Sequence, residues 1–195
     1  QLAHTLMPVG DYTKEEIRVM AERIGLRTAH KPDSQEICFI PDKDYAGFIE
    51  RERGQDVPLP GNFVSGDGKV LGRHKGITHY TIGQRKGLGI AMGYPVFVTE
   101  IRPDTNEVVL GSNEEVFGDI LYCNKLNFMS VPDLDDEMEV VAKIRYNHRG
   151  ASCRIRKVEE DQAECRFSES VRAITPGQAV VFYHGELVVG GGTIL

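Results

Sequence analysis

One cysteine lies in the segment KPDSQEICFI, residues 31–40, between apolar neighbours and just after a run of polar and charged residues. A cysteine in an apolar run is more often part of a hydrophobic core than a nucleophile. A reactive thiol needs its thiolate favoured by nearby positive charge or by a helix N-terminus. Lys31 supplies one positive charge near Cys38, whereas Asp33 and Glu36 oppose it. The local sequence therefore leaves both roles open for Cys38.

The other three cysteines, Cys123, Cys153 and Cys165, form no C-x-x-C pair, and the histidines complete no zinc pattern. Such sparse cysteines are typical of a reducing cytosol, so we expect a cytoplasmic protein without a metal site or a disulfide scaffold. No apolar run is long enough to cross a membrane, and we expect no membrane partner. Because the chain begins with Gln1 rather than Met, we expect it to begin inside a longer protein.

The positive charges are clustered, although the net charge of −6 alone argues against a nucleic-acid partner. Residues 69–99 contain five basic side chains and no acidic one, and residues 140–158 contain six basic side chains and no acidic one. A polyanion responds to the local surface rather than to the sum of the charges. Either run alone is explained most simply as a solvated face of a strand.

The first basic run contains TIGQRKGLG, residues 81–89, in which Arg85 and Lys86 lie between glycines. Backbone N–H groups of a glycine-rich turn and two cations could together hold a phosphate. No G-K-[ST] ends this segment, so it is not a Walker loop. As a motif this signal is weak, and a glycine-rich turn between two strands is the simpler explanation.

The second basic run contains KIRYNHR, residues 143–149. In a strand, Lys143, Arg145 and Asn147 would point to the same side. Tyr146 could then stack on a base while Arg145 contacts a phosphate. A cross-strand pair on an exposed barrel face is the alternative.

Helical signals are confined to the first fifty residues. Residues 13–24 have apolar side chains at helical spacing, a capping box at their start and Gly25 after their end. Residues 37–40 are expected to form a short buried strand ended by Pro41, and a second short helix is expected after Asp42.

The rest of the chain has the pattern of an all-β protein, because short strand-like runs alternate with turn residues. Many short strands at this spacing predict a barrel or a sandwich. The runs are residues 94–101, 107–110, 139–146, 152–158, 163–167, 179–183 and 187–189.

Several segments, taken in order, resemble one family, the bacterial-type tRNA-specific 2-thiouridylases. Separate matches in the right order are far more specific than any one motif. The resemblance covers the chain from about Leu6 onward. The matching segments are DSQEICF (33–39), HYTIGQRKGLG (79–89), PVFV (95–98), NEVVLG (106–111), KIRY (143–146) and ITPGQ (174–178).

This resemblance implies a mainly β fold with a short helical N-terminal segment, a small β-rich central domain and a C-terminal β-barrel. Residues 1–52 would be the end of an ATP-pyrophosphatase catalytic domain, residues 53–112 the central domain and residues 113–195 the tRNA-binding barrel. The S-G-G-x-D-S string of the family's pyrophosphate loop does not occur here. ATP with Mg is therefore expected to bind an N-terminal domain that this chain lacks. We expect no cofactor on these residues and no activity from them alone.

The resemblance also implies a chemical role for Cys38. In the family, ATP adenylates the C2 oxygen of the wobble uridine, a cysteine persulfide delivers sulfur to C2, and AMP leaves. Cys38 matches the persulfide carrier, which ends in a disulfide with the family's first catalytic cysteine. Only sulfur can hold a second sulfur atom and release it by exchange. The sulfur donor would be a relay protein or a cysteine desulfurase.

The same resemblance implies that Arg145, Tyr146 and Gln178 contact tRNA, with the anticodon stem-loop as the partner. Arg85 and Lys86 are added as tRNA-binding candidates on their charge. Phosphate contacts of this kind position an RNA without specifying its sequence.

Two other functions stay open. In the first, the chain is a non-catalytic RNA-binding β-barrel module, and Cys38 belongs to a core. In the second, it is a cysteine hydrolase with Cys38 as nucleophile and His79 or His184 as base, although nothing in their spacing supports this arrangement.

Overall fold

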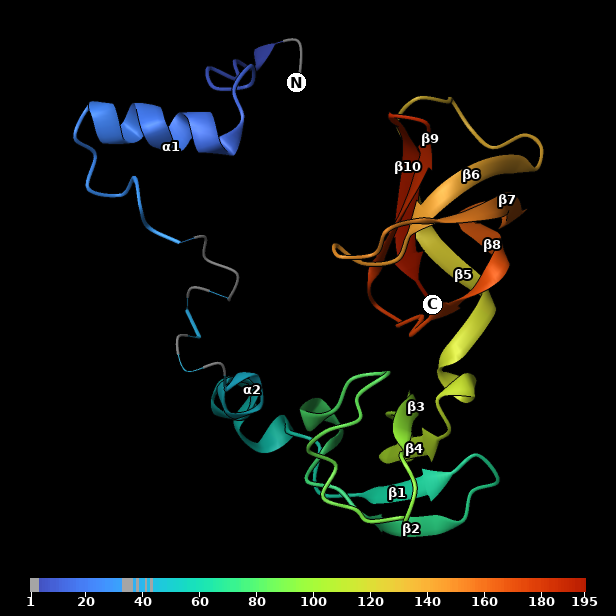
Figure 1. Ribbon diagram of the computed structural model, residues 1–195. Helices are drawn as coiled ribbons and strands as arrows, with labels where there is room; N and C mark the ends of the chain where they lie inside the picture. The colour runs from blue at the N-terminus through green and yellow to red at the C-terminus, as the bar shows by residue number, and fades with distance from the viewer. Residues whose placement is uncertain (1–3, 33–36, 38, 41, 43) are drawn as a thin grey trace. The chain divides into compact units, whose positions relative to one another are not determined.

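The computed structural model describes residues 4–32, 37, 39–40, 42 and 44–195 (Figure 1). The chain divides into two compact units, residues 1–48 and 49–195. Cys38 and its role as persulfide carrier lie outside the described residues. Neither of the two α-helices in the described ranges has the length and apolar character needed to span a bilayer.

The first helix, α1 (Lys14–Arg23), begins at the predicted capping box. The Thr13 hydroxyl accepts the backbone N–H of Glu16 at 3.3 Å, and the Glu16 carboxylate accepts the N–H of Thr13 at 2.7 Å. Gly25, with φ of 73°, follows the helix in the left-handed conformation that commonly ends one. The helix predicted over residues 13–24 is confirmed.

The second helix, α2 (Tyr45–Arg53), is also confirmed. The strand predicted over residues 37–40 is wrong, because the N–H of Ile40 donates to the carbonyl of Ile37 at 2.9 Å and closes a turn. A strand needs a partner for its backbone groups, and the described residues of this unit offer none. Phe39 instead packs on Phe48, with ring centroids 5.4 Å apart.

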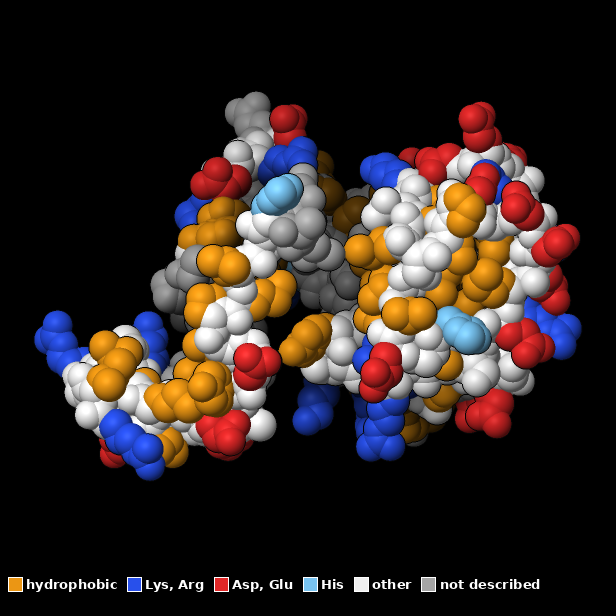
Figure 2. Space-filling view, turned by 90° about the horizontal axis from the view of Figure 1, so that it is seen from above, with side chains coloured by type: hydrophobic (Ala, Val, Ile, Leu, Met, Phe, Trp, Pro, Cys, Tyr) orange, Lys and Arg blue, Asp and Glu red, His pale blue; other side chains and the backbone are white. Residues whose placement is uncertain are grey.

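The first unit buries little of its apolar surface. Leu6, Met7, Ile24 and Leu26 are exposed, and apolar side chains stand out on the face that Figure 2 shows. Neither helix contains a buried residue. The apolar stripe of α1 therefore has the pattern of a core face without a core of its own in the described part of this unit.

A four-stranded mixed sheet begins the second unit, in the order β2-β1-β4-β3. β1 is parallel to β4, and the other pairs are antiparallel. Its strands are β1 (Asn62–Ser65), β2 (Val70–Arg73), β3 (Phe97–Arg102) and β4 (Glu107–Gly111). The single-turn 3₁₀ helices of this unit are Gly54–Asp56, Ile77–His79 and Glu114–Val116.

The long segment between β2 and β3 packs on this sheet through aromatic rings. Phe63 of β1 contacts Tyr80 edge-on at 5.1 Å and His74 at 5.5 Å between ring centroids. His74 Nδ1 accepts the N–H groups of Gly61 and Gly76, so Nε2 carries the proton and donates to the Asn106 carbonyl at 3.0 Å. This buried imidazole thus ties three backbone segments together.

Six antiparallel strands then close into a barrel in the order β10-β5-β8-β7-β6-β9. Figure 1 shows the long strand β5 rising from the end of the central sheet into the barrel. The strands are β5 (Phe117–Phe128), β6 (Met138–Lys143), β7 (Ala151–Glu159), β8 (Gln162–Arg172), β9 (Ala179–His184) and β10 (Leu187–Ile194). The expected fold class, mainly β with a helical N-terminal segment, a small β-rich centre and a C-terminal barrel, is confirmed. The three-domain division at residues 52 and 112 stays a prediction.

Candidate nucleic-acid interface

Arg145, Tyr146 and Gln178 line one hollow of about 300 Å³ on the barrel, which we call the Arg145 pocket. They come together because β6 and β9 are paired, with Lys143 opposite Val181. The turn after β6 therefore lies beside the segment that leads into β9. The structure thus brings all three residues of this prediction to one place.

The predicted alternation of Lys143, Arg145 and Asn147 along a strand is wrong. β6 ends at Lys143, and the N–H of His148 donates to the carbonyl of Arg145 at 3.0 Å. Ile144, just after the strand, is still buried in the barrel core, and the chain turns beyond it. Tyr146 at the tip of this turn is 97% exposed, so its ring is free to stack on a base.

Two cations of the Arg145 pocket have no carboxylate partner within the described part of the chain. Arg145 Nη1 donates to the backbone carbonyl of Arg172 at 2.8 Å, and the Lys143 ammonium lies 5.4 Å from the centroid of the Tyr183 ring. Neither contact neutralises the positive charge. A phosphate would therefore meet uncompensated cations whose positions are already fixed.

Gln178 is held in place through its backbone. Its N–H donates to the Thr175 carbonyl at 3.2 Å, and its carbonyl accepts the N–H of Ile194 at 2.8 Å. Its exposed side-chain amide makes no hydrogen bond within the described residues. That amide can both donate to and accept from a nucleotide.

A second hollow, of about 570 Å³, lies between the barrel and the loop of residues 81–89, which we call the central loop. It shares Arg145 and Gln178 with the first hollow. Arg172 makes this connection, because its Nη2 donates to the Gly83 carbonyl at 3.0 Å and its guanidinium lies 5.6 Å from the centroid of the Phe97 ring. At Gly83, where φ is 84°, a Cβ would lie 2.9 Å from Arg172 Nη1. The glycine allows the loop to sit close to this arginine.

Arg85 and Lys86 project from the same loop but do not line either of these hollows. The Arg85 guanidinium lies 6.0 Å from the centroid of the Phe97 ring and borders a separate hollow of the loop. The Lys86 carbonyl accepts a hydrogen bond from Gln84 at 3.0 Å, and its side chain is exposed. Arg85 thus lines a different hollow from Arg145, although it approaches the same Phe97 ring as Arg172.

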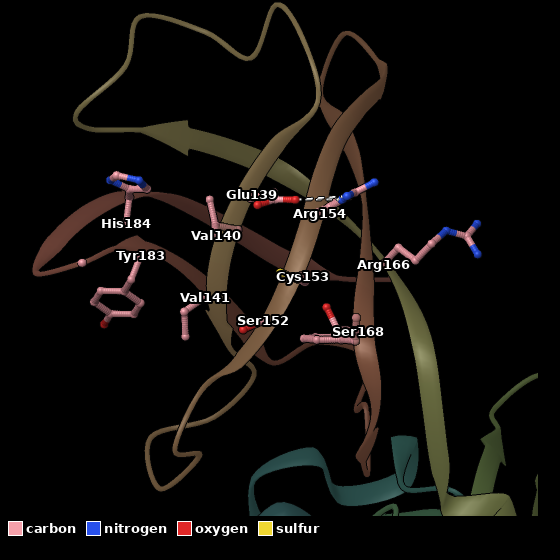
Figure 3. A pocket seen from close by; sticks show the side chains of 12 residues that line it. Glu139, Val140, Val141, Ser152, Cys153, Arg154, Arg166, Ser168, Tyr183 and His184 are labelled. Carbon is pink, nitrogen blue, oxygen red and sulfur yellow. Dashed lines mark hydrogen bonds and ion pairs between the residues drawn. The ribbon is translucent and has the colours of Figure 1, made fainter.

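A further hollow, of about 560 Å³, lies over β6, β7, β8 and β9, and its side chains are drawn in Figure 3. Both arginines that line it are paired, Arg154 with Glu139 at 3.1 Å and Glu137 at 3.4 Å, and Arg166 with Glu164 at 3.4 Å. These carboxylates cancel the charge that a phosphate would need. This hollow is therefore a poorer site for nucleic acid than the Arg145 pocket.

The two histidines of the hydrolase hypothesis have unrelated surroundings. His79 Nε2 lies 3.1 Å from Glu50 Oε1, beside the central sheet, whereas His184 lines the hollow in Figure 3. The described cysteines offer neither histidine a nucleophile, because Cys123, Cys153 and Cys165 are buried in the barrel core.

Arg172 and Tyr183 are the site residues that the sequence analysis missed. Arg172 stands two residues before the segment ITPGQ, but nothing in its local sequence reveals its contact with Gly83, which is far away along the chain. Tyr183 could have been found from the alternation of β9, because residues i and i+2 of a strand share a face and Val181 lies two residues before it.

Three protein families match successive parts of the chain. They are described as the tRNA methyl transferase HUP domain (residues 1–42), the tRNA methyl transferase PRC-barrel domain (residues 46–112) and the aminomethyltransferase beta-barrel domain (residues 118–194).

Curated relatives match along the whole chain. The tRNA-specific 2-thiouridylase MnmA of Lachnoclostridium phytofermentans is 64% identical over 195 residues, which is 100% of this chain and 54% of the relative. The enzymes of the same name from Clostridium acetobutylicum and Carboxydothermus hydrogenoformans are 55% and 49% identical, over 100% and 99% of this chain and 54% and 53% of the relatives. The chain thus spans about half the length of these relatives. It belongs to the tRNA-specific 2-thiouridylase family.

Proposed function

We propose that this chain is part of an enzyme that 2-thiolates the wobble uridine of tRNA, and that its barrel holds the RNA. The convergence of Arg145, Tyr146 and Gln178 on one pocket with unpaired cations carries this proposal. The names of the relatives supply the reaction and the substrate.

The tRNA would be held by charge and by stacking. Arg145 and Lys143 would contact phosphates of the anticodon stem-loop, and the exposed ring of Tyr146 would stack on an unpaired base. Gln178 would form hydrogen bonds beside them. A single-stranded loop suits this pocket better than a stem, because stacking needs bases that are free to splay out.

Cys38 would carry the sulfur as a persulfide, loaded by a relay protein or a cysteine desulfurase. Its terminal sulfur would bond to C2 of the activated uridine as the C2–O bond breaks. A thiolate from a second cysteine would attack Cys38 Sγ and break its bond to the transferred sulfur, which would leave as the 2-thio group of the uridine, and the two cysteines would be left joined as a disulfide. Reduction of that disulfide would be needed before the next cycle.

ATP with Mg is not assigned to the residues of this chain. The sequence contains no glycine- and serine-rich phosphate loop, and the described residues hold no cluster of three or more metal-ligating side chains. We propose that the nucleotide activates the uridine from a part of the complete gene product outside these residues.

A non-catalytic RNA-binding module is the second candidate, because the Arg145 pocket is complete without Cys38. The matching domain families also carry a methyltransferase name. Relatives that match across the whole chain are named for thiolation, and we therefore place thiolation first.

The Cys38→Ser variant of the complete gene product separates these functions. We expect it to bind a tRNA transcript as tightly as the wild type but to form no 2-thiouridine, because serine cannot carry a persulfide. Binding is measured by filter retention, and the modified base by mass spectrometry of digested tRNA. Normal thiolation by this variant would remove Cys38 from the mechanism and favour the module.

A further inference from the structure

A row of residues crosses four neighbouring strands beside the Arg145 pocket. Lys143 of β6 pairs with Val181 of β9, Val181 pairs with Gly191 of β10, and Gly191 pairs with Asn127 of β5. Directly paired residues of adjacent strands share one face of the sheet. The residues on either side of Val181 are buried in the core, so this face is the outside of the barrel. We call these four residues the cross-strand row.

The barrel surface is depressed at the middle of the row, because the residues of β10 there are glycines without side chains. A Cβ at Gly191 would lie 2.4 Å from the Val180 carbonyl oxygen, and one at Gly190 would lie 2.6 Å from the Asn127 carbonyl oxygen. The close approach of neighbouring backbones therefore requires glycine at these positions. The result is a shallow hollow of about 240 Å³ over the strand, the glycine groove.

The glycine groove continues the Arg145 pocket. Ala179 and Val181 line both hollows, so an extended chain could pass from one into the other without leaving the surface. The far end of the groove is lined by Lys125, Asn127 and Met129, all of which are exposed.

Lys125 occupies this end because of a β-bulge. From Asn127 to Asn124, β5 advances three residues while β10 advances two, from Gly191 to Thr193. Lys125 takes up the extra residue with φ of 53°, a left-handed conformation that is unfavourable for a lysine. The Asp161 carboxylate holds this conformation by accepting the N–H groups of Lys125 at 3.0 Å and Leu126 at 2.8 Å. Bulges of this kind redirect side chains.

The lining of the two hollows is positive or neutral throughout. Lys143 and Arg145 lie at one end and Lys125 at the other, and no carboxylate residue lines either hollow within the described part of the chain. Lys125 and Lys143 also form no ion pair with the described residues. The lining thus complements a polyanion.

We propose that the bound RNA continues from the Arg145 pocket, where Lys143 already contacts it, across β9 and β10 to Lys125, with Asn127 and Lys125 as additional RNA contacts. Three inter-strand spacings, roughly 14 Å, separate the ends of the row. A stacked strand that rises about 3.4 Å per nucleotide would cover this distance with roughly four nucleotides. The exposed ring of Tyr146 at the mouth favours RNA over an acidic protein segment. The proposal rests on the proposed tRNA-binding function.

Binding of a tRNA transcript to the complete gene product, measured over a series of salt concentrations, tests this path. Lys125→Gln and Lys143→Gln are each expected to reduce the slope of log K against log salt by about 0.7–0.9, and to weaken binding roughly fourfold near 0.15 M salt. Asn127→Ala should weaken binding without changing the slope, because it removes no charge. Lys157→Gln is the matched control, since it makes the same charge change on β7, where Asp133 already pairs with this lysine at 2.7 Å.

The outcomes separate this proposal from the proposed function. If Lys125→Gln behaves like the Lys157→Gln control while Lys143→Gln and Arg145→Ala lose affinity, the RNA does not follow the groove and the Arg145 pocket stands. If Arg145→Ala binds as tightly as the wild type, both proposals fail. If Lys125→Gln binds tRNA normally but no longer binds a sulfur-donor protein, the groove serves a protein, and the RNA path is overturned.

Discussion

At the scale of single residues, the structure distinguishes Cys123, Cys153 and Cys165 from a reactive thiol. Their exposed fractions are at most 3%, and burial raises the pKa of Cys123 to about 11. A hydrogen bond with Cys153, together with burial, raises the pKa of Cys165. The same hydrogen bond lowers the pKa of Cys153, so burial rather than pKa separates that thiol from reagents. The three cysteines serve as apolar packing in the barrel.

We therefore expect iodoacetamide at neutral pH to label Cys123 and Cys165 roughly a hundredfold more slowly in the folded protein than in denaturant, and Cys153 also more slowly, because it is buried. Peptide mass spectrometry gives the rate at each site, and the denatured protein is the control. Cys38, as the proposed persulfide carrier, should label faster than all three. Rapid labelling of Cys165 in the folded protein would contradict the closed core described here.

At the scale of elements, the sequence analysis predicted the helices, which local residue patterns determine, and missed a strand that forms through pairing with distant strands. The capping box and Gly25 mark α1 within a few residues, so that helix could be predicted. β5 was missed although it is twelve residues long, because polar residues and a bulge at Lys125 interrupt its alternation. It forms because β8 and β10 pair with it on both sides, and that information is not local.

The candidate site likewise has residues that the sequence analysis predicted and contacts that it could not predict. Arg145, Tyr146 and Gln178 could be predicted from resemblance, but their meeting depends on the pairing of β6 with β9. The contact of Arg172 with Gly83 joins residues 89 positions apart, and no spacing rule reports it. The prediction for Cys38 stays a prediction.

Arg172 is expected to position the central loop on the barrel. Arg172→Ala removes a charge-assisted hydrogen bond to Gly83 and the ring contact with Phe97, a loss of about 1–3 kcal/mol. We expect faster hydrogen exchange over residues 81–89, while the barrel amides stay protected. Arg154→Ala, which breaks surface ion pairs with Glu137 and Glu139, is the control. Equal exchange of the loop in both variants would exclude this role for Arg172.

At the scale of the second unit, two buried groups connect stability to pH in different windows. Burial lowers the pKa of His74 below its ordinary 6.5. In the barrel, hydrogen bonds from Arg156 and Tyr122 lower the pKa of Glu164 from 4.5 to about 2. Both folded-state pKa values are depressed, so the unfolded chain takes up protons first as the pH falls, and each group then favours unfolding.

Acid should therefore loosen the central sheet before the barrel. The contribution of His74 is present above pH 6.5 and decreases below it, whereas that of Glu164, roughly 1–3 kcal/mol, is present above pH 4.5 and is lost toward pH 2. Hydrogen exchange at pH 7, 5.5 and 3.5, corrected for intrinsic rates, should show residues 60–80 losing protection first. Glu164→Gln should remove the second step and leave the first unchanged, because His74 packs on rings of the central sheet region and Glu164 bonds to side chains of the barrel strands. Simultaneous loss of protection in both regions would mean that the sheet and the barrel unfold as one cooperative body, with neither group setting the order.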